Sequence, residues 1–558
     1  MVVNLIITAI LYLGLHIGLW KLFEKARYKG WQSLVPILDL WIWMKILKKP
    51  WWWILILMIP GVNVVMFWVI LWNTAECYGK DTTAQRMAAV FFFPVVLPMW
   101  GFDPKVKYLG PDTGRKKSTG EEWAEAIVFA VIAATIIRTF FIEAFQIPSS
   151  SMEKSLMVGD YLFVSKISYG ARSPMTPLTI PFTHSTMPFT DDVPSYIQAV
   201  TLPYFRLPGL GHVERGDVVV FNFPAGDTVA TKLPNQTYYQ ICRNEAGKRF
   251  VDNPAMYKGQ SKDAMYTMGR GIVWKDKRKF GKVVYKPIDK RDHYVKRCVG
   301  LPGDKLEIRN DTLIVNGEVQ KYPTNAQLNY NLAIPSRNKV RELGSTNEDI
   351  IYKYDQAEGL PIPFSKLDEY KKTVKNFRGV HVFGFDGIFR NIEPHDTSVA
   401  KWTMQNFGPI HIPKEGETVE LTPLNFAMYE RCIDVYEGNE VARKDGKIFI
   451  NGQAATSYTF KQDYFWMMGD NRHGSADSRF WGFVPNDHVV GKPVLVWLSM
   501  DPDGKFPMNI RWSRLISVVN KDGTSRSYAI HLLILIAVLM GLNTLYKNGK
   551  LDFIKRKR

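Results

Sequence analysis

Hydrophobic residues are distributed very unevenly along this chain. They are concentrated in the first 145 residues and in a run near the C-terminus, and polar residues interrupt them far more often in between. A bilayer core requires about 20 mostly apolar residues per helix. Five runs approach this requirement, at residues 4–20, 51–72, 87–102, 124–141 and 528–546. The pattern therefore predicts a multi-span α-helical membrane anchor.

Two further features of the N-terminal region refine this anchor. Residues 34–47 are apolar but contain Asp39 and Lys45, which predicts an interfacial or re-entrant segment rather than a span. The first run lacks a positively charged start and an obvious small-x-small cleavage site. We therefore expect it to be a retained anchor and not a cleaved signal peptide.

The placement of basic residues predicts an orientation. The chain has 71 Lys and Arg against 53 Asp and Glu, a net charge of +18 at pH 7, and much of the excess lies beside apolar runs, at residues 21–30, 114–120 and 547–558. Because Lys and Arg next to spans favour the cytoplasmic side, we expect residues from about 145 to 527 to be extracytoplasmic. The same placement argues against nucleic-acid binding, which needs a basic face on a folded domain.

The region after the fourth run changes to short β-type segments. These segments alternate apolar and polar residues between Gly, Pro, Asn and Asp breaks, at residues 215–224, 293–308, 312–317, 446–453, 463–471 and 491–500. Such a pattern is typical of antiparallel sheet. Polar, irregular stretches at about 225–291 and 318–462 interrupt it, and we expect these insertions to have structure of their own, since structureless loops of that length are improbable in a compact domain.

These patterns divide the chain into four regions. Residues 1–110 are predicted to form a multi-span membrane module, and residues 111–145 a basic cytoplasmic linker with the transmembrane helix that follows it. Residues 146–517 are predicted to form the mostly-β extracytoplasmic domain. Residues 518–558 are predicted to form a C-terminal transmembrane helix and a basic cytoplasmic tail.

Candidate chemistry lies in the serine-rich stretch IPSSSMEKSLMVGDYLFV, residues 147–164. A plain surface turn is one interpretation, and a serine nucleophile with a nearby base is another. The base could be a histidine in a triad, Lys154 of the local SxxK sequence, or a distant lysine. No GxSxG surrounds the serines, and the SDN and KTG partners of penicillin-binding enzymes are absent from the outer region. Lys296 lies in an apolar β run, where lost solvation would lower the pKa of an amine.

Metal-dependent chemistry is not supported by the sequence. The four cysteines, Cys77, Cys242, Cys298 and Cys432, form no CxxC pair, which excludes a zinc ribbon. The ten histidines include no HExxH or other clustered ligand spacing. Since three of the cysteines fall in the outer region, one disulfide at most is possible there.

Four sequence boxes together resemble a known family. IPSSSMEKSLMVGDYLFVSKISYG, RGDVVVFNFP, YVKRCVGLPGDKLEI and MGDNRHGSADSRFWGFVP follow one another in this order after a membrane run. The set closely resembles the boxes of bacterial type I signal peptidases (leader peptidases), a family of Ser/Lys-dyad serine proteases. The resemblance runs from the fourth span to about residue 515 and leaves out the two insertions. It implies a signal-peptidase-like catalytic domain of antiparallel sheets.

The resemblance also implies roles for individual residues. Ser151 matches the nucleophile, Lys296 the general base, and Ser149 the serine whose hydroxyl forms the oxyanion hole with the Ser151 N–H. Ser475 matches the serine that positions the lysine. The residues that match those supporting the dyad are Arg297, Asp470, Asn471, Arg472, Asp477 and Arg479. The residues that match those lining the substrate pockets are Ile147, Pro148, Met152, Leu156 and Val295.

The chain departs from the family pattern at two places near these residues. Lys154 stands where the family usually has proline, and His473-Gly474 replace a more usual polar pair. Neither departure touches the implied dyad. The spans before residue 124 and the C-terminal span also exceed the simplest family members, and the region around residues 29–41 looks like an accessory membrane module.

The function implied by the resemblance is cleavage of N-terminal signal peptides from exported preproteins after a small-x-small motif, without a cofactor. The expected partners are preproteins, the lipid bilayer and the secretion translocon. The expected location is the cytoplasmic (inner) membrane, multi-pass, with the catalytic domain extracytoplasmic. The alternative is a membrane scaffold or translocation-associated protein with an inactive peptidase domain. The presence of both Ser151 and Lys296 favours the active enzyme.

Overall fold

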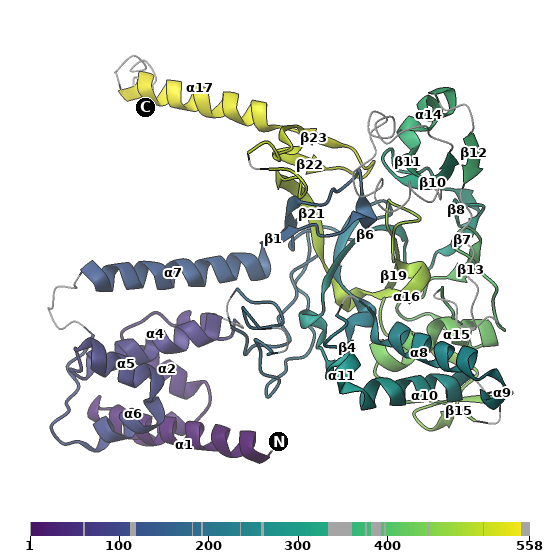
Figure 1. Cartoon of the computed structure of the whole chain (residues 1–558). Coiled ribbons are helices and arrows are strands. Elements are labelled where there is room, and N and C mark those ends of the chain that lie inside the picture. The colour runs from purple at the N-terminus through teal and green to yellow at the C-terminus, as the bar shows by residue number, and fades with distance from the viewer. Residues whose placement is uncertain are drawn as a thin grey trace. The chain divides into compact units, whose positions relative to one another are not determined.

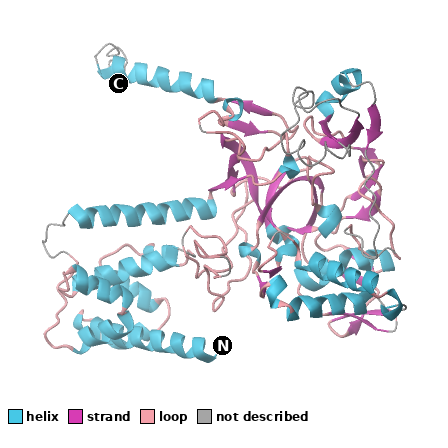
Figure 2. Ribbon diagram, in the orientation of Figure 1, coloured by secondary structure: helices cyan, strands magenta, loops and turns pink. Residues whose placement is uncertain are grey.

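The computed structural model divides the chain into two compact units, residues 1–141 with 173–205, and residues 142–172 with 206–558. Figure 1 shows the chain coloured by residue number, and Figure 2 shows its helices, strands and loops. The structure describes residues 2–59, 62–111, 119–180, 182–190, 193–234, 236–257, 262–332, 360–373, 377–380, 392–395, 398–444, 446–505 and 507–547.

Residues 1–141 of the first unit are mostly helical. Its helices are α1 (Val2–Lys25), α2 (Leu38–Ile46), α3 (Trp53–Leu57), α4 (Val62–Cys77), α5 (Thr83–Phe91), α6 (Phe93–Phe102) and α7 (Thr119–Phe140). Helices α1 and α6 pack closely, because a Cβ on Gly14 or Gly18 would lie only 2.5–2.6 Å from atoms of Pro94 or Leu97. Small residues allow such close approach of two helices. The core beside this contact is apolar and includes Leu22, Trp43, Ile70 and Leu97.

Within the described part of the chain, one helix is long and apolar enough to cross a membrane, Glu122–Phe140 within α7. Helices α5 and α6 would make a second candidate only as one broken span, since they are bent by 117°. The run predicted at 87–102 is therefore not one straight helix, and the run predicted at 51–72 is divided between α3 and α4. Val65–Cys77 and Ala529–Leu542 are shorter apolar stretches within the described parts of α4 and of the last helix. A five-span anchor thus stays a prediction.

The second unit is built on an antiparallel sheet whose strands have the order β1-β2-β21-β3-β6-β19-β20. Its strands are β1 (Ile142–Gln146), β2 (Asp160–Ser165), β3 (Val218–Asn222), β6 (His293–Gly300), β19 (Tyr464–Met468), β20 (Val484–Pro485) and β21 (Val489–Ser499), with β22 (Ser517–Val519) and β23 (Ser525–Ser527) added beside β21. Every pair within it is antiparallel. The mostly-β, antiparallel character predicted for this region is confirmed.

Apolar clusters cover both faces of the sheet at its strand β3. Leu162, Val218 and Val220 belong to one apolar cluster. Val219 and Phe221, the alternating residues of β3, belong to another. Because successive side chains of a strand point to opposite faces, this division explains the nearly continuous apolar run of β3. The sheet is therefore a buried scaffold that holds the loops between its strands.

The remaining elements of the second unit lie in and around the stretches 225–291 and 318–462. The first stretch forms β4 (Thr228–Ala230), α8 (Tyr238–Asp252), α9 (Pro254–Tyr257), α10 (Lys262–Lys275), α11 (Lys277–Phe280) and β5 (Val283–Tyr285). The elements from residue 305 onward are β7 (Lys305–Arg309), β8 (Thr312–Val315), β9 (Glu318–Val319), β10 (Gln327–Leu332), β11 (Leu360–Pro363), α14 (Leu367–Thr373), β12 (Phe377–Val380), β13 (Phe407–His411), β14 (Thr418–Glu420), α15 (Pro423–Arg431), β15 (Val441–Lys444), β16 (Lys447–Ile450), β17 (Gln453–Ala454) and β18 (Ser457–Thr459). Beyond the last sheet strand the chain continues as α17 (Ala529–Lys547).

Candidate active site

The candidate nucleophile lies in a short turn between β1 and β2. Ser150–Met152 form one 3-10 turn. The loop is closed at its base by two backbone hydrogen bonds of 2.9 Å, from Ile147 N to Asp160 O and from Gly159 N to Ile147 O. The Met152 side chain is fully buried beneath the turn. The position of Ser151 is therefore fixed by the sheet and by the apolar core.

The two lysines that the sequence offers as proton acceptors lie in different settings. Lys154 follows the turn with a left-handed φ of 70°, and it is half-buried. Lys296 lies on β6, opposite Val219 of β3. Its Nζ donates a hydrogen bond to Ser151 Oγ at 2.7 Å and another to the Val295 carbonyl at 3.1 Å. Of the two lysines, Lys296 is therefore the one that is hydrogen-bonded to the Ser151 hydroxyl.

Ser151 and Lys296 are both buried. Ser151 is 8 % exposed and Lys296 is 4 % exposed. Burial lowers the pKa of Lys296 from 10.5 to about 8, against the opposing charges of Asp477 and Asp470. A substantial fraction of the amine can then be neutral near pH 8, and a neutral amine can accept a proton.

Two buried ion pairs lie close to Ser151 and Lys296 in the fold. Arg297, next along β6, binds Asp470 through two parallel hydrogen bonds of 2.7 Å from Nε and 2.5 Å from Nη2. Asp477 binds the Arg479 guanidinium through two hydrogen bonds of 2.8 Å. Burial opposes ionisation of both aspartates, but the arginines outweigh it and hold each carboxyl pKa below its ordinary value. Both carboxylates are therefore charged at neutral pH, as bidentate pairing favours.

Gly469 and Ser475 pack against the turn that carries Ser151. A Cβ at Gly469 would lie 2.2 Å from Ser475 Oγ and 2.5 Å from the Ser151 carbonyl oxygen, so only glycine fits. The Gly469 N–H donates to Asp477 Oδ2 at 3.1 Å. Ser475 Oγ is buried and has no hydrogen-bond partner among the described residues. The role of Ser475 toward Lys296 therefore stays a prediction.

Asn471, which directly follows Asp470, is hydrogen-bonded to the turn that carries Ser151. Its backbone N–H donates to the Ser151 carbonyl at 3.1 Å, and its side-chain Nδ2 donates to the Ser150 carbonyl at 3.2 Å. The segment that contains Asn471 is held from the other side by β10, where Gln327 N donates to Asp470 O at 2.8 Å and Arg472 N donates to Gln327 O at 3.0 Å. A strand from the stretch 318–462 thus braces the candidate site.

His473 explains one of the departures from the family pattern. Its Nδ1 accepts a hydrogen bond from Asn329 N of β10 at 3.2 Å, and its Nε2 lies 3.0 Å from Asp311 Oδ1. Sequence reasoning missed these bracing residues, because their partners are more than a hundred residues away. The unusual His473-Gly474 pair was the available signal that this turn has an additional partner.

The residues expected to line substrate pockets lie around the same turn. Ile147, Met152 and Leu156 are buried in one apolar cluster, with Val295 packed partly buried against it. Pro148 and Ser149 are exposed at the start of the turn. Ile147, Pro148, Ser149, Met152 and Leu156 thus belong to the loop that carries Ser151, and Val295 directly precedes Lys296 on β6. Their roles toward a substrate stay predictions.

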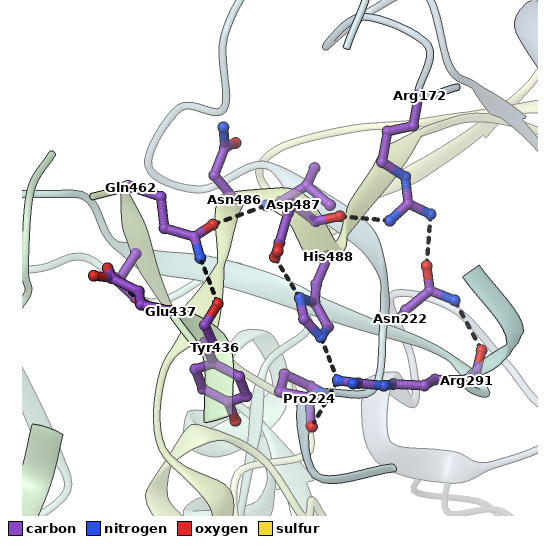
Figure 3. A network of polar contacts seen from close by, with 12 residues as sticks. Arg172, Asn222, Pro224, Arg291, Tyr436, Glu437, Gln462, Asn486, Asp487 and His488 are labelled. Atoms are coloured by element: carbon purple, nitrogen blue, oxygen red, sulfur yellow. Dashed lines mark hydrogen bonds and ion pairs between the residues drawn. The ribbon is translucent and has the colours of Figure 1, made fainter. Parts of the chain in front are cut away.

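Figure 3 shows a buried histidine network in the same unit. His488 Nδ1 donates to Asp487 Oδ1 at 2.5 Å, and Nε2 accepts from Arg291 at 2.6 Å, since a guanidinium can only donate. Arg172 adds a hydrogen bond of 2.6 Å to the Asp487 carbonyl. Burial lowers the pKa of His488 to about 4. Both ring nitrogens are therefore occupied, and this Asp–His pair cannot serve a nucleophile as a triad would.

The cysteines and the possible metal ligands were the remaining candidates that the sequence offered. All four cysteines are buried and free, so the one disulfide that the sequence allowed is not formed. Within the parts of the chain that the structure describes, no group of three or more His, Cys, Asp or Glu side chains could hold a metal ion.

Comparison with known families agrees with this geometry. The family described as "Signal peptidase, peptidase S26" matches residues 120–363 and 453–498, which include Ser151, Lys296 and the segment from Asp470 to Arg479. A family of unknown function, DUF5684, matches residues 31–111 of the helical unit.

Curated relatives match this chain over different shares of their length. Signal peptidase I of Buchnera aphidicola subsp. Baizongia pistaciae is 23% identical over 390 residues, which cover 69% of this chain and 79% of the relative. Signal peptidase I of Haemophilus influenzae is 24% identical over 395 residues, which cover 70% of this chain and 74% of the relative. Signal peptidase IB of Staphylococcus aureus is 40% identical over 90 residues, which cover 15% of this chain and 46% of the relative.

Proposed function

Because the chain belongs to the signal peptidase family, peptidase S26, we propose that it is a membrane-bound serine endopeptidase that removes N-terminal signal peptides from exported preproteins. The observation that carries the proposal is the 2.7 Å hydrogen bond between Lys296 Nζ and Ser151 Oγ within the matched residues. An adjacent base is what a serine needs in order to act as a nucleophile.

The reaction begins with acyl transfer to Ser151. Ser151 Oγ attacks the carbonyl carbon of the scissile peptide bond, and neutral Lys296 takes the hydroxyl proton. The Ser149 hydroxyl and the Ser151 N–H donate to the resulting oxyanion; losing one such donor typically costs about 10²–10³ in rate. The peptide C–N bond then breaks, and the Lys296 ammonium returns the proton to the leaving amine of the mature protein.

Hydrolysis of the ester completes the cycle. Lys296, neutral again, takes a proton from water as the water oxygen attacks the ester carbonyl. The ester C–O bond breaks, the released Ser151 oxygen takes the proton back from Lys296, and the signal peptide leaves as a carboxylic acid. One base thus serves both half-reactions, which is why its pKa near the working pH matters.

Specificity for a small-x-small motif follows from the wall beneath the serine. Ile147, Met152 and Leu156 are closely packed and buried, and Val295 adds to them. We expect the pockets formed by these side chains beside Ser151 to accept little more than a methyl group, because close packing leaves few large voids. The substrate binds in extended form and pairs with strand edges near the site.

The membrane arrangement is also part of the proposal. Helix α7 is the candidate span that leads into the catalytic domain. We place its basic N-terminal flank in the cytoplasm and residues from about 145 to 527 outside the cytoplasmic membrane, where preproteins emerge. The other four runs complete a five-span anchor, and the translocon is the natural neighbour of such an enzyme.

The proposal is tested with the purified full-length protein in detergent and a secretory preprotein. We expect one cut, after a small residue, identified by the masses of the two products. A preprotein in which tryptophan replaces that small residue should not be cut at the same bond. Cleavage that ignores this replacement, or an intact preprotein with the wild-type enzyme, would overturn the proposal.

A further inference from the structure

The second unit contains a cavity of about 520 Å³ that the proposed mechanism does not use. Its walls come from α8, α10 and α15, from the short segment Glu393–His395, and from the ends of the neighbouring sheet strands β3 and β6, at Phe223 and Tyr294. Helices α8 and α10 belong to the stretch 225–291, and α15 belongs to the stretch 318–462. The cavity is therefore made where the two inserted stretches meet the sheet.

This cavity begins beside the dyad. Tyr294, which lines it, is two residues before Lys296 on β6, and side chains two apart on a strand share one face at about 7 Å spacing. Lys296 Nζ lies 5.4 Å from the centre of the Tyr294 ring. Ala476, another wall residue, stands between Ser475 and Asp477. A peptide bound across Ser151 would reach the cavity within a few residues.

Most charged groups of the wall already have partners. Arg431 binds Asp227 at 2.7 Å and lies 4.2 Å above the Tyr239 ring. Arg443 pairs with Glu430 at 3.1 Å. Each of these two arginines thus already faces a carboxylate of the protein.

Arg243 of α8 is different. Its Nε is buried and has no hydrogen-bond partner among the described residues. Burial lowers the pKa of the Arg243 guanidinium from its ordinary value, against the opposing charge of Glu393. Glu393 is itself engaged, since its carboxylate lies 3.2 Å from His395 Nε2. A buried guanidinium with an unused donor is costly, and an acceptor that enters the cavity would relieve that cost.

We propose that this cavity is a subsite for the mature part of the preprotein, and that Arg243 there binds the carboxylate of an acidic side chain. The proposal rests on the proposed signal peptidase activity and adds a substrate preference to it. A guanidinium matches a carboxylate in shape and charge. The aromatic side chains of Phe223, Tyr294 and Trp481 also line the cavity, and a less polar surrounding strengthens a charge-assisted hydrogen bond.

The test uses pairs of preproteins that differ only by glutamate or glutamine at one of the first few positions of the mature part. We measure the ratio of kcat/KM for the glutamate preprotein to kcat/KM for the glutamine preprotein. At one of these positions we expect a ratio of about ten for the wild-type enzyme, which is the effect of one charge-assisted hydrogen bond. Arg243→Gln should reduce this ratio to about one, and Arg243→Lys should retain part of it. Lys248→Gln, at an exposed position of the same helix, is the matched control and should retain the full ratio.

The ratio separates failure of this inference from failure of the proposed activity. If no substrate is cut, the signal peptidase proposal fails. If substrates are cut but no position favours glutamate, or the preference survives in Arg243→Gln, the subsite assignment is wrong. Benzoate is the probe for binding of a small carboxylic acid. If benzoate raises the melting temperature of the wild-type enzyme but not of Arg243→Gln, and no preprotein position favours glutamate, the cavity is a small-molecule site and the substrate role is overturned.

Discussion

At the scale of single residues, catalysis depends on which lysine can lose its proton beside Ser151. Lys296 is buried and hydrogen-bonded to Ser151 Oγ, whereas Lys154 is half-buried and follows the turn. We expect Lys296→Ala to reduce cleavage by about 10³-fold or more, as Ser151→Ala does, and the double variant to be little worse, because the pair acts as one unit. Rates of preprotein cleavage by the purified variants provide the measurement.

Two further substitutions serve as controls for this prediction. Lys154→Ala should retain most of the activity, and Lys296→Arg should not restore it, since a guanidinium stays protonated. An inactive Lys154→Ala enzyme together with an active Lys296→Ala enzyme would show that the local lysine is the base.

The pH dependence of cleavage follows from the same burial. The pKa of Lys296 is lowered to about 8, so the amine carries a proton below that pH and lacks the lone pair that the reaction needs. We expect kcat/KM to rise with pH through about 8, and to fall about tenfold for each pH unit below it. A kcat/KM that does not change between about pH 6 and pH 9, on either side of this pKa, would contradict a lysine base.

The sequence could predict Ser151 and Lys296 as candidates, because each lies in a distinctive box. It could not show that Gly469 must lack a side chain or that His473 contacts Asn329 and Asp311. Those requirements arise from the packing of segments far apart in the chain. Local patterns carry little information about such contacts.

At the scale of elements, the segment after β19 is held by buried ion pairs. Asp477 and Arg479 are both almost completely buried, so removing one charge leaves the other without compensation. We expect Asp477→Asn to lower the free energy of unfolding by about 3–5 kcal/mol and to reduce activity with it. Thermal or denaturant unfolding of the purified protein, measured beside its cleavage rate, tests this expectation.

A matched substitution separates the effect of burial from that of charge. Asp501 pairs with Arg511 at 3.6 Å at an exposed position, so Asp501→Asn should change stability by less than about 1 kcal/mol. Lost activity with unchanged stability in Asp477→Asn would instead favour a direct catalytic role for Asp477.

The helical elements show where pattern reasoning reached its limit. The run at 87–102 is apolar throughout, yet α5 and α6 are bent by 117° at its middle. Pro94 lies in the first turn of α6, where proline is tolerated because its missing N–H has no helical partner. Hydropathy measures composition and not direction, so it predicted an apolar segment correctly but could not predict its bend.

At the scale of the whole molecule, the orientation in the membrane is the main expectation. Reporter fusions or single-cysteine labelling should place residues 115–118 and 555–558, which lie outside the described residues, in the cytoplasm. They should place Ser151 and Asp470 on the opposite side, because basic flanks stay cytoplasmic. A C-terminal tail found outside would exclude the five-span arrangement, since the last run would no longer cross in the required direction.

The central claim is that Ser151 carries the signal peptide as an ester during cleavage, and acid quenching during turnover tests it most directly. Mass spectrometry of the digested enzyme should find the signal peptide attached to the fragment that contains Ser151. The attachment and the mature product should both be absent when Ser151→Ala enzyme is used. An adduct on a different residue, or mature protein released by Ser151→Ala, would contradict the account.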